Sequence, residues 1–162
     1  MVTKKVKKII ERLILIETIL EVVRIAQIIR EAEEGVDYII CSPEDGAKIA
    51  SRFIGRDDRE VFFVMCLNTK NNVVPVHRCH VGSLNSSIVH PREVYKSAIL
   101  NNAASVIIAH QHPSGDIKPS MEDINVTKRL VEAGKLLSIE VLDHLVVNSD
   151  NSFTSLKERG YI

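Results

Sequence analysis

Two histidines and one aspartate are spaced so that they could bind a metal ion. His110 and His112 are separated by a single residue, and Asp123 follows after ten further residues. Because residues i and i+2 of an extended segment project to the same side, both imidazoles can reach one ion. Asp123 can complete a His₂Asp ligand set, and three protein ligands leave a fourth position for water. This arrangement is typical of a catalytic rather than a structural zinc site.

The same residues also have structural explanations, which stay open at this point. A His-x-His pair is most often two partly exposed loop histidines, and Ser120-x-x-Asp123 has the spacing of a helix capping box. A cap can hold the backbone of Asp123 while its carboxylate faces a metal ion, so the two interpretations are compatible. His144, beside Asp143 in a predicted interior strand, is expected to support a ligand or to be a satisfied core histidine, rather than to bind metal itself.

Length, composition and charge limit the class of protein. The chain has 162 residues, 45% of them hydrophobic, which predicts one globular domain or one domain with a short arm. The formal charge is zero, with 21 Lys and Arg against 21 Asp and Glu, whereas proteins that coat DNA usually have a basic excess. Cys41, Cys66 and Cys79 include no Cys-x-x-Cys pair. This argues against a disulfide framework and a cysteine-rich zinc site, and we expect the three side chains to be small buried hydrophobes.

The first 35 residues match neither a signal peptide nor a membrane span. The apolar segment Leu13–Ile29 contains Glu17, Glu21 and Arg24, and each charge would cost about 2.5–3.5 kcal/mol near the centre of a bilayer. We therefore expect a cytoplasmic protein in a reducing compartment, with no membrane partner.

The order of predicted elements indicates an α/β domain. Residues 1–35 are expected to form an N-terminal arm that is helical over about Lys4–Ile16, with helix and strand both open beyond Thr18. Four helices are expected to alternate with four strands. One helix begins at Ser42-Pro43, the next at Pro91 and the third after Ser120, and a short closing helix spans Phe153–Gly160. The strands are Val61–Leu67, Val73–Val81 (an edge or bulge, because of Pro75), Ser105–Ala109 and Ile139–Val147. Residues 36–162 are therefore expected to form a three-layer domain, a mixed β-sheet flanked by helices.

Longer motifs around these residues resemble a known family. His110-x-His112, seven residues and then Ser120-x-x-Asp123 look like the JAMM motif of JAB/MPN-type metalloproteins. Five segments resemble the RadC-like family of bacteria: His80-Val-Gly-Ser-Leu-Asn, His90-Pro-Arg-Glu, Ala109-His-Gln-His-Pro-Ser-Gly, Pro119-Ser-x-x-Asp123 and Leu142-Asp-His. Gln111 stands where that family often has asparagine, a difference expected to be harmless. The resemblance runs from about Tyr38 to Ile162 and implies the JAB/MPN architecture, which is similar to that of cytidine deaminases. The deaminase signature His-x-Glu with Pro-Cys-x-x-Cys is absent, so base deamination is not expected.

The resemblance implies roles for five residues. They are His110, His112 and Asp123 as ligands of Zn²⁺, Glu60 as the general base, and Ser120 as the group that stabilises an oxyanion or fixes the water. The implied activity is that of a JAMM-type zinc metallopeptidase, which hydrolyses a peptide or isopeptide bond in an unknown protein or peptide. Glu60 is preferred as the base over Glu44 and Glu93, because it immediately precedes a strand expected to be central.

A second hypothesis is a DNA-repair-associated or mobile-element accessory protein that acts by DNA binding or nuclease chemistry. Many RadC-like proteins carry an N-terminal helix–hairpin–helix module, and the traditional label of the family is DNA repair. Residues 1–35 contain one glycine, at their very end, so this module is not expected here, and any DNA binding should be weak and steeply salt-dependent. A non-catalytic scaffold is a third hypothesis, against which the intact ligands count. The sequence leaves open whether the arm binds a partner or pairs two protomers into a homodimer.

Overall fold

The computed structural model describes residue 27 and residues 38–82 and 89–162. The expected N-terminal arm, with its helix or strand, lies outside the described residues except for residue 27. The described part of the chain contains the helices α2 (Pro43–Ile54), α3 (Pro91–Leu100) and α4 (Met121–Leu137). Its strands are β1 (Val61–Leu67), β2 (Val73–Val81), β3 (Ser105–Gln111), β4 (Glu140–Val147) and β5 (Phe153–Ser155).

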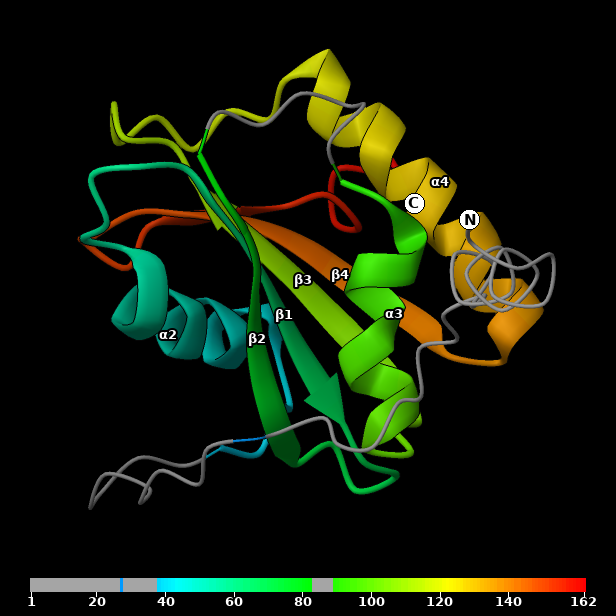
Figure 1. Ribbon diagram of the computed structural model, residues 1–162. Helices are drawn as coiled ribbons and strands as arrows, with labels where there is room; N and C mark the ends of the chain where they lie inside the picture. Colours follow the sequence, from blue (N-terminus) through cyan, green and yellow to red (C-terminus); the bar gives the residue numbers. More distant parts are fainter. Residues whose placement is uncertain (1–26, 28–37, 83–88) are drawn as a thin grey trace, which may run out of the picture. The chain divides into compact units, whose positions relative to one another are not determined.

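The strands form one mixed sheet in the order β2-β1-β3-β4-β5 (Figure 1). Strand β1 is antiparallel to both β2 and β3, β3 is parallel to β4, and β4 is antiparallel to β5. Helix α4 connects the parallel pair, as a crossover between parallel strands requires. Strand β2 is at the edge of the sheet and its pairing with β1 has register shifts, which confirms the expectation drawn from Pro75.

Helices cover both faces of the sheet, so the domain has the three layers that the sequence predicts. Alternate residues of β1 point to opposite faces. Phe63 and Met65 pack in the cluster that contains α2, whereas Phe62 and Val64 pack in the cluster that contains α3 and α4. Every residue of β1 and of β3 is buried, which explains why the sequence of both strands is apolar on both faces.

Two helices begin with capping boxes that the sequence encodes locally. Ser42 and Asp45 form one at the start of α2, followed by Pro43 in the first turn, as expected. Ser120 and Asp123 form the other at the start of α4. Each Ser hydroxyl accepts from the backbone N–H three residues later, and each Asp carboxylate accepts from the backbone N–H of the Ser, so two otherwise unpaired N–H groups are satisfied.

The end of the chain differs from the prediction. The prediction of a closing helix at Phe153–Gly160 is wrong. Phe153–Ser155 forms β5 instead, which pairs with β4 so that Thr154 lies opposite Val146. Hairpin pairing with the preceding strand β4 satisfies this backbone and buries Thr154 and Ser155, and these contacts outweigh local helix preference. Strand β3 also runs to Gln111, two residues beyond the predicted end, so His110 lies within it. Cys66 is buried and Cys79 partly buried as expected, but Cys41 is exposed.

Helices α3 and α4 pack closely where a glycine removes the side chain. A Cβ atom at Gly134 would lie 2.4 Å from the hydroxyl oxygen of Tyr95 and 2.4 Å from the carbonyl oxygen of Ile139. The fully buried Tyr95 hydroxyl donates to the carbonyl of Leu130, 2.7 Å away. Gly134, which would weaken an isolated helix, is therefore required by this close approach. It fixes the C-terminal half of α4 against α3.

No helix within residues 38–82 and 89–162 is both long enough and apolar enough to cross a membrane.

Candidate metal centre

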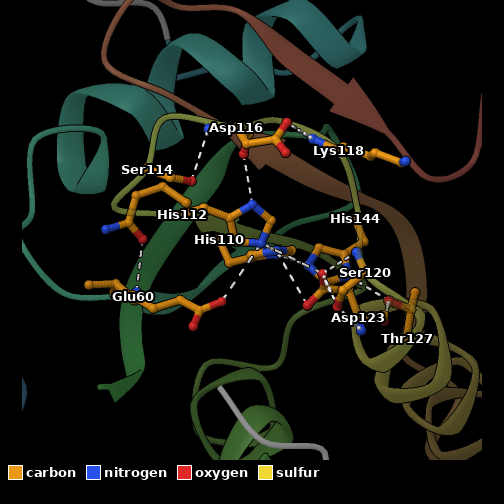
Figure 2. Close-up of polar contacts among 12 residues, drawn as sticks. Glu60, His110, His112, Ser114, Asp116, Lys118, Ser120, Asp123, Thr127 and His144 are labelled. Carbon is orange, nitrogen blue, oxygen red and sulfur yellow. Dashed lines mark hydrogen bonds and ion pairs between the residues drawn. The ribbon is translucent and has the colours of Figure 1, made fainter. Parts of the chain in front are cut away.

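The structure brings together four of the five predicted site residues as a group of potential metal ligands. Glu60 immediately precedes β1, His110 lies at the end of β3, His112 follows in the next loop, and Asp123 lies in the first turn of α4. One nitrogen or oxygen atom from each lies within 4.8 Å of the others (Figure 2). Parallel pairing and the α4 crossover create this meeting point, because the end of β3 and the start of α4 lie at the same edge of the sheet.

The separations between these atoms suit a single small cation. The Nε2 atoms of His110 and His112 are 3.2 Å apart, and Asp123 Oδ1 is 3.4 Å from the first while Asp123 Oδ2 is 3.7 Å from the second. Two donors bound about 2.0–2.1 Å from a tetrahedral zinc ion lie about 3.3–3.4 Å from each other. Glu60 Oε1 is 3.8 Å from His112 Nε2, and these two side chains are more exposed than those of His110 and Asp123. The side chains therefore fit a His₂Asp zinc site with a carboxylate beside it.

Hydrogen bonds on the outer side of His112 orient its ring. Its Nδ1 lies 2.7 Å from the carbonyl oxygen of Asp116, which can only accept, so Nδ1 carries a hydrogen and Nε2 faces the centre. The turn that offers this carbonyl is held by the Ser114 hydroxyl, which accepts from the Asp116 N–H, and by the Asp116 carboxylate, which accepts from the Lys118 N–H. The hydrogen bond with Asp123 raises the pKa of His112 more than burial lowers it. Without a metal ion, a proton on His112 would therefore partly neutralise the centre.

Asp123 caps the helix and faces the histidines at the same time, so the two interpretations of its motif are both consistent with the geometry. Its Oδ2 accepts from the Ser120 N–H and the Ser120 hydroxyl, both at 2.7 Å, while Oδ1 lies toward His110. Burial opposes ionisation of this carboxyl, but contacts with His110, His112 and Ser120 outweigh it and hold its pKa far below the usual range. Asp123 is therefore an anion at all ordinary pH values, as a metal ligand must be.

His144 lies behind His110 and does not reach the centre. It is fully buried on β4, and its Nε2 is 2.7 Å from His110 Nδ1 while its Nδ1 is 2.5 Å from the hydroxyl of Thr127 on α4. Burial, and then the proximity of His110, keep the pKa of His144 well below its ordinary value. The neighbouring Asp143 serves another purpose, because its carboxylate accepts from the Ser155 hydroxyl and the Lys157 N–H and so fastens β5 to β4.

Gln111 is a site residue that the sequence analysis did not identify. Between the two histidines, it points to the other side of β3, where it is almost fully buried. Its Oε1 accepts from the Val61 N–H at 2.8 Å, and its Nε2 donates to the carbonyls of Arg59 at 2.5 Å and Asp57 at 3.2 Å. Two of the bonded residues, Arg59 and Val61, immediately precede and follow Glu60 in the sequence. No sequence signal indicates this role, because the predicted strand ends at Ala109 and the partners of Gln111 lie about 50 residues earlier in the chain.

An open pocket of about 350 Å³ lies against His112. Its other lining residues come from the loop after α2, the loop after β3 and the turn between β4 and β5, and are Gly55, Arg56, Asp57, Pro113, Gly115, Asn148 and Ser149. The lining is mostly polar, and its position gives a ligand access to one side of the centre.

An α/β domain with a candidate metal-binding group at this edge of a mixed sheet is consistent with the JAB/MPN class. The model of the RadC-like JAB domain family matches residues 40–161. A UPF0758 protein of Geobacillus sp. (strain WCH70) is 54% identical over 125 residues, which are 77% of this chain and 55% of that protein. UPF0758 protein YsxA of Bacillus subtilis (strain 168) is 49% identical over 144 residues, which are 89% of this chain and 62% of that protein. The chain therefore belongs to the RadC-like JAB domain family, and it spans a little over half the length of these relatives.

Proposed function

We propose that this chain is a zinc-dependent hydrolase of the JAMM type that cleaves a peptide or isopeptide bond. The observation that carries the proposal is the convergence of two imidazole Nε2 atoms and two carboxylates within 4.8 Å. Carboxylates and imidazole lone pairs repel one another unless a cation lies among them, so the arrangement favours a metal ion. Family membership supports the same proposal.

His110, His112 and Asp123 would hold the zinc ion, and the side chain of Glu60 would lie beside it. Bound zinc supplies Lewis-acid polarisation of a carbonyl and a water molecule of lowered pKa. The carboxylate of Glu60 would accept a proton at Oε1 from the attacking water and return it to the leaving amine. Glu60 is the acid nearest to His112 Nε2 after Asp123, which favours it over Glu44, in the first turn of α2, and Glu93, which pairs with Lys96 on α3.

We propose that the main role of Ser120 is to hold the carboxylate of Asp123 in place. Its hydroxyl donates to Asp123 Oδ2, so donation to a substrate oxyanion would require this hydrogen bond to be exchanged. Removal of one oxyanion donor typically lowers the rate by about 10²–10³. A polypeptide substrate would reach the centre through the pocket beside His112. The lining of this pocket is mostly polar, so it can form hydrogen bonds with the backbone of an extended chain.

The test compares three purified proteins: wild type, His112→Ala and Glu60→Gln. Metal analysis should find about one zinc ion per chain in the wild type and in Glu60→Gln, and none in His112→Ala. Peptide, isopeptide and single-stranded DNA substrates are then screened under identical conditions. On a substrate that the wild type cleaves, Glu60→Gln should be about 10²–10⁴ times slower, because glutamine cannot accept the proton.

Each unfavourable result removes a specific part of the proposal. Equal zinc content in the wild type and His112→Ala would exclude the metal centre. Loss of zinc from Glu60→Gln would make Glu60 a ligand rather than the base. Cleavage of DNA but of neither peptide substrate would favour the DNA-associated hypothesis.

A further inference from the structure

We propose that Thr127 and His144 form a hydrogen-bond relay that fixes the tautomer of His110, so that its Nε2 lone pair faces the metal centre. The relay rests on the proposed metal site and makes Thr127 and His144 positioning residues, since neither reaches the centre. It runs from the first turns of α4 through β4 to β3, and all of its side chains are fully buried (Figure 2).

The direction of the relay follows from a group that can only accept. The Thr127 hydroxyl lies 2.6 Å from the carbonyl oxygen of Asp123, one helical turn earlier, and a carbonyl has no hydrogen to give. The single hydrogen of the hydroxyl is therefore used in this bond. The 2.5 Å contact between Thr127 Oγ1 and His144 Nδ1 then requires the imidazole to donate, so His144 carries its hydrogen on Nδ1.

The other nitrogen of His144 must then accept. The ring is fully buried, and among the described residues it makes hydrogen bonds only with Thr127 and His110. A charged imidazolium without a carboxylate partner is costly at such a place, so the ring is neutral and its Nε2 has a lone pair. At 2.7 Å from that lone pair, His110 Nδ1 is the donor. A neutral His110 consequently has no hydrogen on Nε2, the atom that faces Asp123 and His112.

The relay also links two of the proposed ligands. The Thr127 hydroxyl donates to the backbone carbonyl of Asp123 and accepts from His144, which in turn determines which nitrogen of His110 carries the hydrogen. The same hydroxyl therefore acts on both proposed ligands. Without this hydroxyl, a hydrogen on His144 Nδ1 would have no acceptor. The ring would then favour a hydrogen on Nε2, which turns His110 Nδ1 into the acceptor. The hydrogen of His110 would move to Nε2 and donate to Asp123, and it would have to be displaced before a metal ion could bind.

The test uses Thr127→Val, which keeps the shape of threonine but lacks the hydroxyl, and Thr127→Ser as the matched control that keeps it. Two-bond ¹H–¹⁵N NMR spectra of the metal-free proteins, at a pH of about 8 where ordinary histidines are neutral, report which ring nitrogen carries the hydrogen. The wild type and Thr127→Ser should show His110 and His144 with the hydrogen on Nδ1. Thr127→Val should show His110 with the hydrogen on Nε2. Zinc titration should show about 10–100-fold weaker binding for Thr127→Val and a change of less than about 3-fold for Thr127→Ser.

The spectra separate failure of the relay from failure of the proposed function. A wild-type His110 with its hydrogen on Nε2 would overturn the relay, whether or not zinc binds, and this measurement remains decisive if Thr127→Val does not fold. Equal zinc affinity of Thr127→Val and the wild type would also overturn it. The expected tautomers in a wild type that binds no zinc would uphold the relay and exclude the metal-dependent function.

Discussion

Replacement of Gln111 by methionine should destabilise the fold and displace Glu60. Methionine has a similar length and the same unbranched shape, but it can neither accept from Val61 nor donate to the carbonyls of Arg59 and Asp57. The Val61 N–H is buried and would lose its partner, which costs about 1–3 kcal/mol. Arg59 is exposed and Asp57 half-buried, so water can replace most of what their carbonyls lose, at about 1 kcal/mol in total. We expect the free energy of unfolding to fall by about 2–4 kcal/mol.

Urea unfolding of the wild type and Gln111→Met measures this loss, and Asp58→Ala is the matched control. Asp58 is exposed in the same loop, and its side chain makes no hydrogen bond or ion pair with the other described residues, so its substitution should change stability by less than about 0.5 kcal/mol. An unchanged dependence on urea concentration would show that the folded and unfolded states keep their exposed areas. A loss below about 0.5 kcal/mol for Gln111→Met would refute the argument that this side chain clamps the loop. Retained zinc with reduced hydrolysis would show in addition that the clamp positions Glu60.

Two further predictions concern the contact between α3 and α4. Tyr95→Phe removes the hydrogen bond to the Leu130 carbonyl and should lower stability by about 1 kcal/mol at neutral pH. Burial raises the pKa of Tyr95 to about 12, so the stabilising effect of its neutral hydroxyl is complete below pH 10 and is lost as pH rises from 10 toward 12. Urea unfolding across that pH interval should show the difference in free energy of unfolding between the wild type and Tyr95→Phe becoming smaller. A difference that stays constant would contradict a stabilising role of the neutral hydroxyl. Gly134→Ala, which places a methyl group 2.4 Å from a backbone oxygen, should cost more than the roughly 1 kcal/mol that alanine normally gains in a helix, and a more stable variant would show that the close approach is not required.

The fold was predictable where its signals are local. The starts of α2 and α4 depend on Ser42 and Ser120, whose capping partners lie three residues away in the sequence. Strand β1 and the segment Val106–Ala109 of β3 are apolar on both faces, so their composition predicts buried strands, whereas the polar end of β3 at His110 and Gln111 is not predicted in this way. The segment Phe153–Ser155 is not helical as predicted, because it pairs with β4 in a hairpin across the turn at residues 148–152, and this pairing outweighs its helix preference.

The site was predictable to a similar extent. His110, His112 and Asp123 lie close in the sequence and carry a specific motif, whereas Glu60 came from the family resemblance. The partners of Gln111 lie about 50 residues away in the sequence, beyond the reach of spacing arguments. The pairing of Thr127 with His144 likewise depends on how α4 packs on β4, and the sequence leaves open whether His144 supports a ligand or is a satisfied core histidine.

Helix α4 is held at both ends, and this gives the domain a mechanical property. An α-helix is stiff along its axis, and the 11 residue-to-residue steps from Asp123 to Gly134 correspond to about 16–17 Å of nearly incompressible helix. The Tyr95 contact sets the axial position of that helix at one end, and the aspartate is carried at the other. A substitution that moves Tyr95 is therefore expected to shift α4, and with it the Asp123 carboxylate, relative to His110. The affinity of the proposed site for metal could thus be adjusted in small steps from the far side of the core, with every proposed ligand left intact.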